Sequence, residues 1–131
     1  MKELHHLTDL QIEILNVIWT RGEATVADVH QGLAEHDLAR KTVGTLMMRL
    51  EKQGVLEYRV DGREHVYRAT VSRGEVGRAT VRNVLQRLFA GSVPVLLSHA
   101  LEVDEVHPGD LEKVREMLNA WDAEEGRHAQ P

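Results

Sequence analysis

The chain has 131 residues, enough for one domain or for a small domain with an accessory part. It contains no cysteine, which excludes disulfides, thiolate metal ligands and cysteine nucleophiles and is compatible with a reducing cytoplasm. The net charge is -5, but residues 38–68 carry seven Lys and Arg against four Asp and Glu, a net of +3 that leaves -8 on the remainder. A basic segment on an acidic chain suits a specific DNA-binding protein, with an ordinary mixed surface as the alternative.

The first part of the chain predicts two short helices. The pattern from Thr8 to Gln11 is a capping box, in which the two residues satisfy each other's backbone N–H groups, and Gly22 ends the helix that follows. A second helix is expected from Thr25, with Asp28 favourably placed in its first turn. In both helices apolar residues recur at helical spacing, so each helix buries one face.

A third helix is expected from Ala39 or Arg40 until Gly54 stops it, and a hairpin follows in which Tyr58 and Tyr67 pair across the strands. The expected parts of the hairpin are the strand 55–60, the turn Asp61-Gly62 and the strand 63–69. Three short helices and a hairpin make a winged helix-turn-helix, expected over residues 1–71. Its expected core consists of Leu10, Ile14, Ile18, Val29, Leu33, Val43, Leu46 and Leu50.

The third helix and the hairpin tip carry side chains that suit contact with a DNA duplex. Lys and Arg neutralise phosphates, and Arg, Lys and Thr also reach base edges. A recognition helix inserts its N-terminal part into the major groove. The predicted DNA-binding residues are therefore Arg40, Lys41, Thr42, Thr45, Arg49 and Arg63. Arg49 could instead pair with a carboxylate. Arg59 and Arg68 could be strand residues that face solvent and do not contact DNA.

Residues 72–131 are expected to form an all-helical dimerisation domain with a polar C-terminal tail. Helices are predicted at 73–90, at 93–101 after a Ser92 cap, and from about residue 108. About 50 residues are too few to bury so many apolar side chains alone, so we expect a second copy to cover them, with the same chain as the alternative. The predicted dimerisation residues are Val84, Leu85, Leu88, Phe89, Leu96, Leu97, Leu101, Leu111, Val114 and Leu118.

The predicted fold class is thus mainly α with a small β-hairpin, a winged helix-turn-helix followed by a helical dimerisation domain. No enzyme is expected, because the chain lacks a Gly-rich phosphate loop, a nucleophile elbow and an H-E-x-x-H motif. The histidines lack ligand spacing, so neither a metal nor a cofactor is expected. Without a signal peptide or a membrane-length apolar run, the predicted location is cytoplasmic, with no membrane contact.

Two other functions fit the residues less well. One is a winged-helix module that binds another protein, which would favour apolar residues where the basic residues stand. The other is a regulator that binds a small molecule in a pocket at the dimer interface, lined by the apolar segment 93–101.

Five segments in order resemble the penicillinase repressor family, the BlaI/MecI-type repressors. They are LTDLQIEILNVIW (7–19), GEATVADVH (22–30), TVGTLMMRLEKQG (42–54), GREHVYRA (62–69) and LFAGS (88–92). The resemblance implies a homodimeric repressor that binds an inverted-repeat operator in double-stranded DNA and controls β-lactamase or cell-wall-stress genes. It also implies a sensor metalloprotease as a partner and inactivation by a cut in the C-terminal domain.

Two features separate this chain from branches of that family. The copper-responsive branch carries a cysteine cluster near the C-terminus, and this chain has no cysteine. Some members are cut at an Asn–Phe bond in the first C-terminal helix, whereas Asn83 here precedes Val84.

Overall fold

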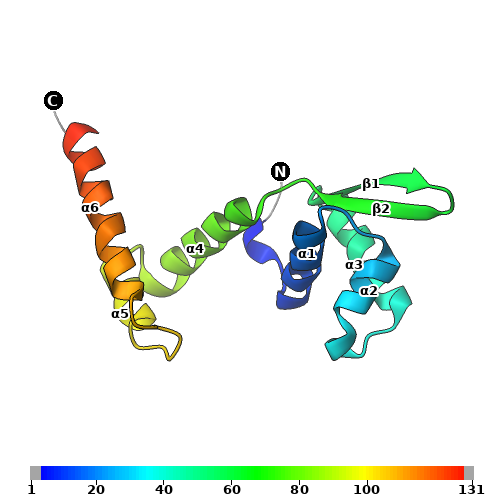
Figure 1. Cartoon of the computed structure of the whole chain (residues 1–131), viewed down its shortest axis with the longest axis horizontal. Helices are drawn as coiled ribbons and strands as arrows, with labels where there is room; N and C mark the ends of the chain where they lie inside the picture. The colour runs from blue at the N-terminus through cyan, green and yellow to red at the C-terminus, as the bar shows by residue number, and fades with distance from the viewer. Residues whose placement is uncertain (1–3, 129–131) are drawn as a thin grey trace. The chain divides into compact units, whose positions relative to one another are not determined.

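The computed structural model describes residues 4–128, except for the side chains of His5 and 126–128. Its elements, in chain order, are η1 (Leu4–His6), α1 (Asp9–Arg21), α2 (Val26–Gly32), η2 (Ala34–His36), α3 (Arg40–Lys52), β1 (Leu56–Asp61), β2 (Glu64–Ala69), α4 (Arg73–Phe89), α5 (Val93–Ala100) and α6 (Asp110–His128) (Figure 1). The mainly helical fold with an antiparallel hairpin confirms the predicted fold class. No helix among the described residues is both long and apolar enough to cross a bilayer.

Contacts divide the chain into two compact units, Met1–Arg87 and Leu88–Pro131. The division falls after the boundary expected at residue 71, because Val76 on the first turn of α4 is buried in the core of the first unit. Trp19 adds to this junction, since its indole Nε1 donates to the Val71 carbonyl at 2.9 Å. The assignment of DNA binding to residues 1–71 and of dimerisation to residues 72–131 stays a prediction.

Capping boxes begin both α1 and α2; the sequence predicts the first of them, and for α2 it predicts the start at Thr25. Thr8 and Gln11 exchange side-chain and backbone hydrogen bonds at the start of α1, and Gly22 ends that helix at a φ of 89°. Thr25 and Asp28 do the same at α2, where the Thr25 N–H donates to the Asp28 carboxylate at 3.0 Å. That backbone hydrogen bond lowers the pKa of Asp28 below its usual 3.8, and the Thr25 hydroxyl and Arg21 lower it further.

We expect Asp28→Ala to lower the free energy of unfolding by about 1 kcal/mol at neutral pH, because it removes half of a capping box. Because the pKa of Asp28 is lowered in the folded state, its ionised carboxylate stabilises the fold at pH values above the unfolded pKa of 3.8. This stabilisation is lost as the pH falls through the pKa of the folded state. Urea unfolding at pH 7 and at pH 3 should therefore show the deficit shrinking in acid. Glu35→Ala is the control, and a deficit that is unchanged at pH 3 would refute the assignment.

The core of the first unit lies among α1, α2, α3 and the hairpin. Six of the eight predicted core residues are buried, whereas Leu10 and Leu46 lie partly exposed at its edge. Leu15 is fully buried as well, and so is Met47, whose helical spacing with Val43 and Leu50 predicts a buried face. Met47 follows Val43 by one helical turn, so it lies at the centre of the buried face of α3, and Leu46 lies beside it.

The hairpin is antiparallel, with Tyr58 opposite Tyr67 as expected. Its turn is Gly62-Arg63 rather than Asp61-Gly62, because Asp61 still pairs with Glu64. Gly62 has a φ of 66°, which glycine adopts without strain at the first position of a two-residue hairpin loop. The shift by one residue places Arg63 at the outermost point of the hairpin.

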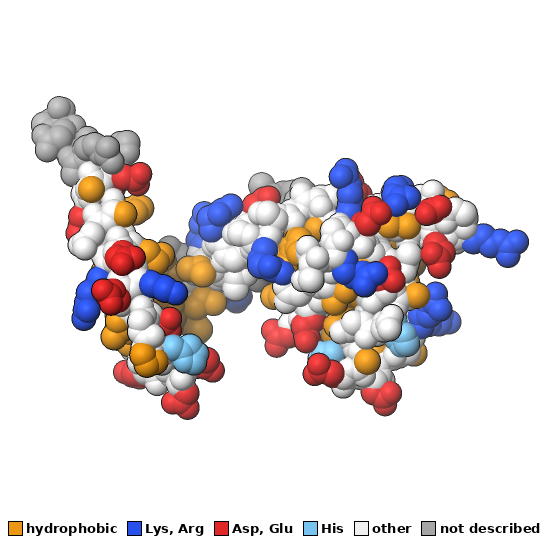
Figure 2. Space-filling model, in the orientation of Figure 1, with side chains coloured by type: hydrophobic (Ala, Val, Ile, Leu, Met, Phe, Trp, Pro, Cys, Tyr) orange, Lys and Arg blue, Asp and Glu red, His pale blue; other side chains and the backbone are white. Residues whose placement is uncertain are grey.

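The second unit exposes much apolar surface. Ser92 caps α5 as predicted, and Phe89 packs against His99 with ring centroids 5.3 Å apart. α6 begins at Asp110, two residues later than expected, after Gly109 at a φ of 96°. None of the predicted dimerisation residues is buried in the single chain. Orange apolar side chains are visible over α5 and the adjoining part of α6 (Figure 2).

Candidate nucleic-acid interface

α3 is amphipathic and turns one face away from the core. Val43, Met47 and Leu50 recur at helical spacing and are fully buried, which fixes the rotation of the helix. Arg40 and Lys41 lie in the first turn on the exposed side, where recognition helices insert into DNA. Burial of one face therefore determines which residues α3 presents to a partner.

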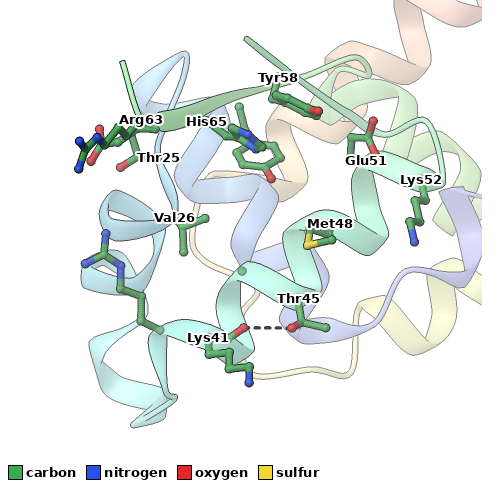
Figure 3. A pocket seen from close by; sticks show the side chains of 14 residues that line it. Thr25, Val26, Lys41, Thr45, Met48, Glu51, Lys52, Tyr58, Arg63 and His65 are labelled. Carbon is green, nitrogen blue, oxygen red and sulfur yellow. Dashed lines mark hydrogen bonds between the residues drawn. The ribbon is translucent and has the colours of Figure 1, made fainter. Parts of the chain in front are cut away.

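A groove with a volume of about 660 Å³ runs between this face of α3 and the hairpin (Figure 3). Four of the predicted DNA-binding residues line it: Arg40, Lys41, Thr45 and Arg63. Lys52 lines it as well, together with the carboxylates Glu51 and Glu64. The structure thus brings the N-terminal part of α3 and the hairpin tip to one basic groove.

Thr42 and Arg49 do not line the groove. They are seven residues apart, hence on one face of the helix, and both are exposed on the side of α3 next to Thr45. That face remains open to a duplex wider than the groove. Their contact with DNA, like that of the other predicted site residues, stays a prediction.

The cations of this surface have no acidic partner, in contrast to those of the hairpin strands. Within the described residues, no ion pair involves Arg40, Lys41, Arg49, Lys52 or Arg63. The two cations of the hairpin strands are paired instead. Arg59 meets Glu23 at 2.8 Å, which raises its pKa, and Arg68 is paired with Glu57. The charges of α3 and the hairpin tip are therefore free to neutralise an anionic ligand. Lys and Arg side chains are visible along the hairpin and at its end (Figure 2).

Sequence reasoning missed several residues that line the groove, among them Gly44, Met48, Tyr58 and His65. The Tyr58 and His65 rings are stacked, with centroids 4.2 Å apart and an interplanar angle of 10°. Tyr67 lies beside them, and burial raises its pKa, with smaller contributions from Tyr58 and Glu51. The hairpin register could have identified this cluster, because His65 is diagonal to Tyr58 on the same face of the two strands.

Among residues 4–128, no three His, Asp or Glu side chains are grouped to hold a metal ion. Every buried side-chain nitrogen or oxygen in that part of the chain has a hydrogen-bond partner. The groove is the one surface described here where free charge, exposed helix and a hairpin meet.

A helix-turn-helix followed by a hairpin, with unpaired cations on the third helix and the hairpin tip, defines a winged-helix DNA-binding regulator. The comparisons with known proteins agree. The family model described as Penicillinase repressor matches residues 7–120. The chain therefore belongs to the penicillinase repressor family of DNA-binding transcriptional repressors, which are not enzymes.

Individual relatives cover most of the chain. The transcriptional regulator BlaI of Mycobacterium tuberculosis is 35% identical over 105 residues, 78% of this chain and 76% of that protein. The penicillinase repressor of Bacillus licheniformis is 24% identical over 119 residues, 90% of this chain and 93% of that protein. Among solved structures, the DNA-binding domain of the repressor BlaI is 28% identical with a TM-score of 0.50 and covers 57% of this chain and 93% of its own.

Proposed function

We propose that this repressor acts as a homodimer on an inverted-repeat operator, with one α3 helix in the major groove of each half-site. The observation that supports this most directly is the set of unpaired cations on α3 and at the hairpin tip. Lys41 lies in the first turn of α3 and Arg63 at the end of the hairpin, so one chain holds phosphates on both sides of the groove that α3 enters. Thr42, Thr45 and Arg49 then face base edges or the adjoining backbone.

A second copy of the chain covers the apolar faces of α5 and α6. In the single chain, 40% of the Leu97 side chain and 50% of the Leu118 side chain are exposed. Other predicted dimerisation residues are exposed as well. Apolar surface on this scale on one short unit favours a permanent partner. A two-fold symmetric dimer presents two identical α3 helices, and the operator it reads is then itself symmetric.

The regulated genes are those that answer β-lactams or cell-wall stress. Relatives named penicillinase repressor and methicillin resistance regulatory protein support this. The repressor acts on chromosomal DNA in the cytoplasm, and a sensor metalloprotease relieves repression by cutting its C-terminal domain. A cut in the last turns of α4, which contain Asn83 and Val84, separates the DNA-binding unit from α5 and α6 without touching α3.

Footprinting and mass measurement test the proposal together. We expect the full chain to sediment as a dimer and to protect a two-fold symmetric site on its own promoter, with half-sites one helical turn or a small multiple apart, about 34 Å per turn. A monomer in solution, or protection that does not depend on sequence, would contradict it.

A further inference from the structure

One part of the groove is apolar although cations surround it. Gly44, Thr45 and Met48 line the groove on α3, between Lys41 in the first turn and Lys52 in the last (Figure 3). We call Gly44, Thr45 and Met48 the apolar patch. It lies on the face of α3 that the proposed function places against base edges.

Met48 is 54% exposed, and it is the exposed large apolar side chain of α3. Nothing in the packing of the first unit accounts for it, since the core side of α3 is filled by Val43, Met47 and Leu50. An unbranched thioether adapts its shape to an irregular apolar surface. A flexible apolar side chain on a DNA-facing helix is suited to contact with another apolar group.

The Thr45 hydroxyl is already engaged in a hydrogen bond within α3. Its hydroxyl donates to the Lys41 carbonyl at 3.1 Å, as the dashed line in Figure 3 shows. The single hydroxyl hydrogen is thereby used within the helix. What remains for a partner is the methyl group and the acceptor lone pairs of the oxygen.

The packing around Gly44 does not require a glycine at this position. A Cβ at this position would meet only Val26, at 3.7 and 4.0 Å, which is ordinary van der Waals contact. Glycine inside a helix is unfavourable relative to alanine. Bare backbone next to Met48 and Thr45 lets a base pair approach more closely than any side chain would.

We propose that the apolar patch reads thymine 5-methyl groups in the major groove, with Met48 as the main contact and the Thr45 methyl beside it. The inference rests on the proposed function. The thymine methyl is the apolar feature of base-pair edges in that groove, whereas the other features are hydrogen-bond donors and acceptors. A patch with no free donor, the Met48 side chain and the Thr45 methyl group complements that methyl and donates no hydrogen bond to the acceptors of guanine.

Methyl deletion in the DNA tests this without altering any other group. The full chain first selects its site from a random duplex pool, and each thymine of the selected half-site is then replaced by deoxyuridine. We expect at least one replacement to weaken binding about fourfold, the value for one buried methyl group. Met48→Ala should bind the thymine site about fourfold more weakly and should no longer distinguish thymine from uracil at that position.

Two further variants separate methyl contact from general damage. Thr45→Ser keeps the hydroxyl and removes only the methyl, so it should lose part of the same discrimination. Gly44→Ala should raise the Tm yet weaken operator binding, since a packing defect would lower both. Failure to select any site would contradict the proposed function itself. A selected site whose affinity is indifferent to uracil, or a Met48→Ala protein that keeps the full preference, would overturn the inference alone.

Discussion

A chain that ends at Arg87 should remain folded but bind its operator roughly 10²–10⁴-fold more weakly than the full chain. The first compact unit, which contains α3 and the hairpin, is complete at that point. In the dimer, binding of one half-site brings the second α3 to a high local concentration beside the other half-site. Loss of α5 and α6 removes this linkage and leaves the DNA contacts of each unit intact.

The cut belongs after Arg87 rather than after Val71. Val76 is buried with the core of the first unit, and Arg73 lies over the Trp19 ring at 5.2 Å, so a shorter chain loses part of that core. Folding of the truncated chain can be verified by its thermal unfolding. Analytical ultracentrifugation and operator titration then measure the oligomeric state and the affinity.

A point variant isolates the dimer contact in the full chain. Leu97→Glu and Leu118→Glu alter exposed side chains, so each should leave the monomer stable while placing a charge in the dimer interface. Asn119→Glu introduces the same charge at another exposed position of α6 and is the matched control. If the leucine variants still sediment as dimers, or if the truncated chain binds as tightly as the full one, the dimer contact lies elsewhere.

The double variant Lys41→Ala/Arg63→Ala should weaken binding to every sequence and reduce the slope of log K against log salt by about two. Both side chains are free of ion pairs in the described structure, Lys41 in the first turn of α3 and Arg63 at the hairpin turn. Each released counterion contributes about 0.9 to the slope, so the expected change follows from two lost phosphate contacts.

Arg59→Ala/Arg68→Ala is the matched control, because it removes the same formal charge from the hairpin. These two guanidiniums are held by Glu23 and Glu57, so they contribute little to phosphate binding. Titrations between about 50 and 200 mM salt compare the two pairs. Equal slopes for both double variants would show that net charge, and not the free cations, determines affinity.

The sequence predicted the parts of this fold that depend on local signals. The capping box at Thr8, the helix start at Thr25 and the glycine after α1 are determined by a few neighbouring residues, and the structure confirms them. The buried face of α3 follows from its helical spacing. The hairpin turn was displaced by one residue, because both Asp61-Gly62 and Gly62-Arg63 fit a two-residue turn and only the strand register distinguishes them.

The groove could not be predicted from the spacing of residues in the sequence, because it depends on contacts between residues that are far apart in the chain. Which cations are paired depends on residues far apart in the chain, as with Arg59 and Glu23. The stacking of Tyr58 on His65 depends on the register of the hairpin, and the bond from Thr45 to the Lys41 carbonyl depends on a side-chain rotamer. The extent of α4 in the core of the first unit depends on packing at Val76.

Site-directed cross-linking tests most directly that two α3 helices read a symmetric operator. The natural chain has no cysteine, so a Thr45→Cys variant carries one thiol on α3, to which a photoactivated cross-linker can be attached. Asn16→Cys, exposed on α1, is the control. The expected result is cross-linking from the Thr45→Cys protein at two positions related by the operator two-fold axis, one in each half-site, and none from the control. Cross-links at a single position, or equal yields from both proteins, would contradict the account.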